Sequence, residues 1–109
     1  MSELQCVDDA NFEAEVIKSN VPVLVDFSAT WCGPCQRQLP ILQKFADANV
    51  DKIKVVKIDI EDAPEITSKL GIRGVPSMVL FNQGQRLDMK VGLTSLSELT
   101  NFVLTKIGV

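Results

Sequence analysis

The sequence contains no histidine and no tyrosine, and it has a single tryptophan and 3 cysteines. No apolar run approaches the roughly 18 residues of a membrane-spanning helix, so we expect no membrane partner. The net charge of −3 comes without a clustered basic face, which argues against nucleic acid. The amino-terminal stretch lacks the basic start and apolar segment of an export signal, which favours a cytoplasmic location. The composition, 46% hydrophobic and 23% charged, is that of a globular protein, and we expect a single domain over residues 1–109.

Two of the cysteines stand close together in the stretch WCGPC, residues 31–35. A structural disulfide across so few residues would stabilise little, because closing a short loop removes little chain entropy. Zinc needs four ligands, commonly Cys and His, and this chain has only Cys6 to add to the pair, so we expect no metal site. Covalent haem attachment needs a histidine where Gln36 stands. Redox chemistry is the favoured interpretation, and a structural disulfide stays open.

Hydrophobic periodicity predicts strands and helices around this motif. The apolar run 21–29 is typical of a strand covered on both faces, a helical period follows over 34–49, and a β-branched run covers 53–60. Together they predict a parallel βαβ unit. Two more helices are predicted, one over 8–20 capped by Asp8 or Asp9 and one over 61–71 capped by Asp62. A hairpin of strands 77–82 and 86–91 should turn at Gly84. A last helix should open with the capping box of Ser95 and Glu98 and bury Leu96. The sum is an α/β fold, with a mixed central sheet and helices on both faces.

The cysteine pair falls where the buried strand ends and the next helix begins. Pro34 suits the first helical turn, since its φ is preset and it has no N–H to leave unpaired. The other N–H groups and the dipole of that turn favour the thiolate form of a cysteine beside them. Cys35 lies on the apolar stripe of the helix and should be buried, whereas Cys32 precedes the stripe and should be exposed. This asymmetry predicts that Cys32 is the nucleophile and that Cys35 resolves the mixed disulfide.

Four stretches resemble the thioredoxin family in order and spacing: VDFSATWCGPC, GIRGVPS (71–77), LFNQGQ and KVG (90–92). The resemblance implies the thioredoxin fold, a five-stranded mixed β-sheet flanked by four α-helices, with a cis peptide bond before Pro76. It implies a general protein-disulfide reductase, part of electron transport and cell redox homeostasis, whose Cys32–Cys35 pair cycles between dithiol and disulfide. No cofactor would be bound, because electrons would come from NADPH through thioredoxin reductase. The other partners of this monomer would be disulfide-containing target proteins.

The same resemblance assigns roles to residues around the cysteines. Asp26 interrupts its apolar strand, where poor solvation raises the pKa of a carboxyl and makes it a candidate proton acceptor, although a structural aspartate is the alternative. Lys57 interrupts the next strand, and its positive charge would lower the pKa of Asp26 that burial raises. The alternative is a lysine whose amine reaches solvent. A target peptide would pair with the backbone of Val75 like an added strand. The expected contact surface comprises Trp31, Gly33, Pro34, Gly74, Val75, Pro76 and Gly92. The alternatives are that Trp31 packs in the core and that Pro76 is an ordinary loop proline before a strand.

Two further positions bear on the chemistry. Cys6, in a predicted first strand, is expected to be a small buried residue, with a regulatory thiol as the alternative. Gln36 follows the motif where many thioredoxins have a lysine, so one cation near the thiolate is missing. Related oxidases and isomerases usually have a histidine between the cysteines, so Gly33 and Pro34 favour reduction. The alternative from another class is a binding module whose cysteine pair only switches partner affinity.

Overall fold

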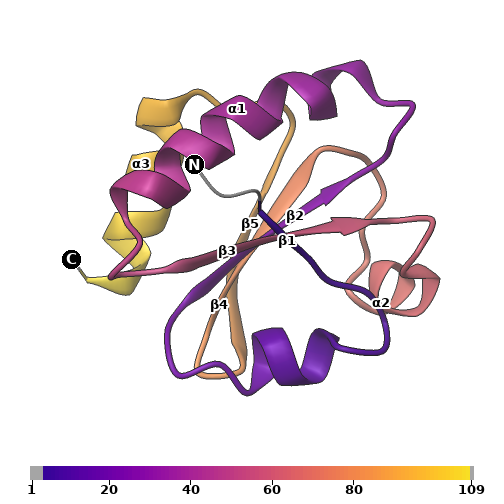
Figure 1. Ribbon diagram of the computed structural model, residues 1–109, viewed down its shortest axis with the longest axis horizontal. Coiled ribbons are helices and arrows are strands. Elements are labelled where there is room, and N and C mark those ends of the chain that lie inside the picture. Colours follow the sequence, from indigo (N-terminus) through magenta and orange to yellow (C-terminus); the bar gives the residue numbers. More distant parts are fainter. Residues whose placement is uncertain (1–3, 109) are drawn as a thin grey trace.

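The computed structural model describes residues 4–108, which form a five-stranded mixed sheet with helices against both faces (Figure 1). The strand order is β1-β3-β2-β4-β5; β3 pairs in parallel with β1 and β2, and β4 is antiparallel to β2 and β5. The elements are β1 (Gln5–Cys6), the π-helix η1 (Glu13–Ile17), β2 (Val23–Ser28), α1 (Gly33–Ala48), β3 (Lys54–Asp59), α2 (Pro64–Lys69), β4 (Ser77–Asn82), β5 (Gln85–Val91) and α3 (Leu96–Ile107). The predicted fold is confirmed, although one of its helices is a short π-helix. None of the helices between residues 4 and 108 combines the length and the apolar character needed to cross a bilayer.

The central strands divide their side chains between two cores, because successive side chains on a strand point to opposite faces. Val25 and Phe27 of β2 pack on the face covered by η1 and α2, whereas Leu24 packs with residues of α1 and α3. Figure 1 shows the two pairs of helices on opposite sides of the sheet. Asp26 alternates with Phe27 and therefore belongs to the α1 face, and its register partner on β3 is Lys57. The sheet thus places both charged residues on the side of the helix that carries the cysteine motif.

The predicted hairpin turn and the predicted start of the last helix are confirmed. The hairpin between β4 and β5 turns at Gln83 and Gly84, whose φ angles of 53° and 78° are the positive pair that a type I′ turn requires. Helix α3 begins with the predicted capping box, in which the Ser95 hydroxyl accepts from the Glu98 N–H and the Glu98 carboxylate accepts from the Ser95 N–H. Leu96 is an exception, since it is 40% exposed and not buried as predicted. It is the first residue of the helix, and Leu99 and Val103 make the core contact instead.

The amino-terminal helix and the start of α2 differ from the predictions. The helical segment covers only residues 13–17, and its N-cap is Phe12, with no side-chain cap, so the predicted cap at Asp8 or Asp9 is wrong. The Asp8 carboxylate accepts from the N–H groups of Ala10 and Asn11 in the turn that precedes the helix. The cap predicted for α2, Asp62, is also wrong, since the helix starts after Ala63 and no side chain at its N-cap bonds the helix. The residue that does so is Asp9, whose carboxylate accepts from the N–H groups of Glu65 and Ile66 at 3.1 and 2.9 Å. A loop distant in sequence therefore stabilises the first turn of α2.

Removal of this cap should destabilise the protein measurably. We expect Asp9→Ala to lower the free energy of unfolding by about 1 kcal/mol, as the loss of a helix cap usually does. Urea unfolding followed by circular dichroism measures the change. Asp51→Ala is the control, because Asp51 is exposed and its carboxylate accepts no hydrogen bond from residues 4–108. Equal stability of Asp9→Ala and the parent protein would contradict the capping role.

Candidate active site

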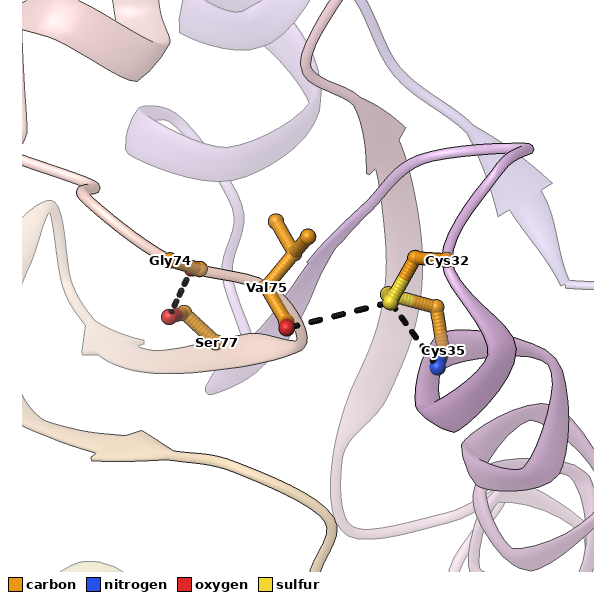
Figure 2. The surroundings of a disulfide bond; sticks show 5 residues. All are labelled: Cys32, Cys35, Gly74, Val75 and Ser77. Atoms are coloured by element: carbon orange, nitrogen blue, oxygen red, sulfur yellow. Dashed lines mark hydrogen bonds between the residues drawn. A yellow bond between two sulfur atoms is a disulfide. The ribbon is translucent and has the colours of Figure 1, made fainter.

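Cys32 and Cys35 form a disulfide at the start of α1, with their Cα atoms 5.2 Å apart (Figure 2). Cys32 is the N-cap residue of the helix, and Pro34 lies in the first turn as predicted. The Cys32 sulfur accepts a hydrogen bond from the backbone N–H of Cys35 at 3.2 Å. An N–H of the first helical turn directed at a sulfur stabilises negative charge on it. The helix start therefore favours the Cys32 thiolate once the disulfide opens.

The two sulfurs differ in accessibility less than the sequence predicted. Cys35 is completely buried, as expected, but the exposure predicted for Cys32 is wrong, since only 6% of that residue is exposed. Cys32 and Cys35 pack with Ala29 in a small cluster, against which Ile60 and Val75 also lie. Contacts with residues distant in sequence thus cover most of Cys32. A thiol from another protein still meets Cys32 first, because Cys35 offers no surface.

The peptide bond between Val75 and Pro76 is cis, as the resemblance implied. Figure 2 shows the Val75 carbonyl oxygen pointing at the disulfide, and it lies 3.8 Å from the Cys32 sulfur. A disulfide sulfur carries no hydrogen, so this is a packing contact that only a reduced thiol can turn into a hydrogen bond. The Ser77 hydroxyl donates to the Gly74 carbonyl at 2.6 Å and closes the turn. Within residues 4–108 the Val75 N–H donates to no acceptor, which leaves it for an incoming strand.

Exposed apolar side chains stand on both sides of this turn. Trp31, directly before Cys32, is 66% exposed, and Val91 and Leu93, on either side of Gly92, are 63% and 46% exposed. The Gly92 N–H donates to the Pro76 carbonyl at 2.8 Å, which fixes this loop beside the cis-proline. A pocket of about 210 Å³ is lined by Trp31, Ile60, Ile72, Arg73, Gly74 and Val75. Apolar surface gathered in this way is typical of a protein-binding site.

The predicted contact residues differ in how far they reach the surface. Trp31, Gly33, Pro34 and Gly74 are exposed, Val75 and Gly92 are half-buried, and Pro76 is buried. The sequence interpretation missed Val91 and Leu93, for which the available signal was their apolar character next to Gly92. These two side chains extend the surface beyond the predicted residues.

Asp26 is completely buried, and neither of its carboxylate oxygens has a hydrogen-bond partner among residues 4–108. Burial raises the pKa of Asp26 from 3.8 to about 7, and the charge of Lys57 lowers it against that trend. Lys57 is half-buried. A carboxyl group with a pKa near neutrality exchanges protons at ambient pH, as a proton acceptor for a thiol must.

A second pocket, of about 530 Å³, opens beside Lys57 and gives its side chain a way to solvent. Cys6 lines the same pocket and is exposed, so its predicted burial is wrong. The reason is that β1 is a two-residue strand at the edge of the sheet, paired only with β3. The other lining residues are Val7, Asp8, Ser28, Ala29, Thr30, Gln36, Leu39, Asp59 and Asp62. In the part of the chain that the structure describes, no three His, Cys, Asp or Glu side chains gather to hold a metal ion.

The sequence interpretation also missed a buried pair behind the cysteines. Gln38 on α1 and Thr94, in the loop between β5 and α3, are 0% and 1% exposed. The Gln38 amide donates to the Thr94 carbonyl at 3.0 Å and accepts from the Thr94 N–H at 2.8 Å. The signal in the sequence was a glutamine one turn after Cys35, on the face of the helix that Cys35 shares.

One sulfur of the disulfide reaches the surface, next to the Val75 backbone N–H that can pair with an incoming strand. This arrangement is suited to exchange with a disulfide of another protein. The sheet and this site together define a dithiol–disulfide oxidoreductase.

Comparison with known proteins agrees. The thioredoxin family model matches residues 3–105. Thioredoxin 1 of Synechococcus elongatus is 43% identical over 101 residues, 93% of this chain and 94% of the relative. Thioredoxin of Rickettsia bellii is 45% identical over 97 residues, 89% and 92% of the two chains. Thioredoxin 1 of a Nostoc species is 43% identical over 100 residues, 92% and 94% of the two chains. The chain therefore belongs to the thioredoxin family, and its redox pair is Cys32 and Cys35.

Proposed function

We propose that the protein reduces disulfides of other proteins in two steps. The Cys32 thiolate attacks one sulfur of the target disulfide, the target S–S bond breaks, and the leaving sulfur departs as a thiolate that takes a proton from water. Cys35 then gives its proton to Asp26 and attacks the Cys32 sulfur, which releases the second target thiolate. The protein is left with the Cys32–Cys35 disulfide seen in the structure. The observation that carries the proposal is this disulfide at the start of α1, facing the cis bond between Val75 and Pro76.

The surroundings of the disulfide supply the contacts that this reaction needs. A target segment pairs with the free backbone of Val75, and its side chains lie against Trp31, Gly33, Pro34, Gly74, Pro76 and Gly92. Lys57 adjusts the proton affinity of Asp26, because its positive charge favours the ionised carboxylate. The intramolecular second step has a high effective concentration, so the mixed disulfide is short-lived.

The oxidised protein must be reduced again before the next turnover. We propose that thioredoxin reductase supplies the electrons from NADPH, in the cytoplasm, and that the protein acts as a monomer and electron carrier without a bound cofactor. Two observations support this proposal. The chain belongs to the thioredoxin family, and one sulfur of its disulfide, that of Cys32, can be reached by a thiol of a partner protein.

Reduction of insulin tests the proposed function. With NADPH and thioredoxin reductase, catalytic amounts of the protein should drive continuous NADPH oxidation and precipitate the insulin B chain. Cys6→Ser is the matched control and should turn over like the parent protein, because Cys6 lies on β1 and has no part in the exchange. Insulin reduction no faster than with the reductase alone would refute the function.

A further inference from the structure

Gln38 is completely buried on α1, three positions after Cys35, and buried glutamine side chains are uncommon. Both ends of its amide are used by one residue, since Nε2 donates to the Thr94 carbonyl and Oε1 accepts from the Thr94 N–H. Thr94 lies in the loop that joins β5 to α3. The amide therefore ties the backbone of this loop to the helix that carries the cysteines.

Further hydrogen bonds connect Thr94 to the cis-proline turn. The Thr94 hydroxyl donates to the Gly92 carbonyl at 3.0 Å, and the Gly92 N–H donates to the Pro76 carbonyl at 2.8 Å. The residue before Pro76 contacts Cys32, which brings the chain of contacts back to the start of α1. The helix, the loop after β5 and the cis-proline turn thus hold one another around the disulfide.

Two exposed apolar side chains depend on this arrangement. Val91 ends β5 and pairs with Ser77 on β4, and Leu93 lies between two bonded residues. The Gly92 N–H before Leu93 donates to the Pro76 carbonyl, and the Thr94 N–H after it donates to the Gln38 amide. The Cys32 sulfur is oriented mainly by its own helix, through the Cys35 N–H and the helix start, and the loop after β5 reaches it only indirectly, through Pro76 and the Val75 contact. Displacement of the loop should therefore weaken contacts with a protein target and leave the sulfur chemistry intact.

We propose that Gln38 is a positioning residue for protein targets, which holds Val91 and Leu93 beside the cis-proline through Thr94. This inference rests on the proposed reductase function and adds to it a separation of roles. The cysteines and Asp26 carry out the exchange, whereas Gln38 determines how well a folded or extended polypeptide is recognised. A small disulfide reaches Cys32 without touching the loop, so it should not be affected.

The test compares two substrates of the reduced protein. Gln38→Met keeps the length of the side chain but makes no hydrogen bond to Thr94. We expect its kcat/KM for insulin to fall about tenfold or more through a higher KM, since small displacements of positioning groups have effects of this size. Its rate with the small disulfide 5,5′-dithiobis(2-nitrobenzoic acid) should stay within about twofold of the parent protein. Gln43→Met is the control on the same helix, because the Gln43 amide bonds only the exposed Asp47.

Thr94→Ala provides a second variant that leaves α1 unchanged. It removes the hydroxyl bond to Gly92 and keeps the backbone groups that Gln38 binds. We expect a smaller loss of the same kind, confined to insulin, and this variant decides the question if Gln38→Met does not fold.

The outcomes separate this inference from the function on which it rests. A loss confined to insulin supports the positioning role. An equal loss with both substrates, or no loss with either, overturns it while the parent protein still reduces insulin. A parent protein that reacts with the small disulfide but fails to reduce insulin refutes the proposed function, and this inference with it.

Discussion

Cys32→Ser should abolish insulin reduction, with a loss of more than about 10³-fold, because the covalent route starts at this sulfur. Cys35→Ser should lose turnover as well, but for a different reason. Its Cys32 thiolate still attacks the target, and no second thiol follows to release it. The variant should therefore accumulate a mixed disulfide with the target, which the parent protein does not. The difference follows from accessibility, since Cys35 is completely buried and only Cys32 reaches the surface.

Non-reducing gel electrophoresis and peptide mapping measure this trapping. Both variants should be made in a Cys6→Ser background, because the exposed Cys6 could otherwise form mixed disulfides of its own. The mapped bond in Cys35→Ser should join the target to Cys32. If Cys32→Ser traps the target to the same extent through Cys35, the assigned roles are reversed.

Asp26→Asn should make the oxidised protein more stable, and the gain should grow with pH. Asp26 has a pKa of about 7 in the folded protein, compared with an ordinary value of 3.8. The folded state thus binds this proton more tightly than the unfolded state does. The stability that the group contributes is fully present below about pH 4 and is lost as the pH rises through about 7. Asparagine does not ionise, so the variant avoids this loss.

The expected difference in the free energy of unfolding is close to zero near pH 4 and reaches at most about 4 kcal/mol above pH 8, at about 1.4 kcal/mol per pKa unit. Urea unfolding at a series of pH values measures it. Asp51→Asn, at an exposed position, is the control and should show no such trend. A difference between Asp26→Asn and the parent protein that is the same at all pH values would contradict the raised pKa.

The parts of the fold that the sequence predicted well are encoded locally. The apolar run of β2, the helical period of α1 and the β-branched run of β3 each contain the signal for their own element. The hairpin turn at Gly84 and the capping box at Ser95 are also read from neighbouring residues. Because the strand and helix around the cysteines are each encoded locally, the sequence alone predicts that the cysteines lie at the start of a helix.

The predictions that failed depend on contacts between distant residues. Asp9 caps α2 from 56 positions away along the chain, so the local candidate Asp62 was the wrong choice. Gln38 and Thr94 are also 56 positions apart, and the helical period alone shows only that position 38 faces inward. Cys32 is covered because Val75 and Ile60 pack against its cluster, which no pattern near the motif indicates. Whether a single residue at the site is buried therefore depends on how segments distant in sequence pack against it.

The reduction potential of the Cys32–Cys35 pair tests the central claim most directly, because it distinguishes a reductant from an oxidant or isomerase. Equilibration of the protein with defined ratios of dithiothreitol to its oxidised form, followed by thiol alkylation and mass spectrometry, gives the value. From its membership of the family we predict a potential near that of thioredoxins, about −270 mV. A potential at or above about −180 mV, where protein disulfide isomerase lies, would contradict the assignment as a reductase.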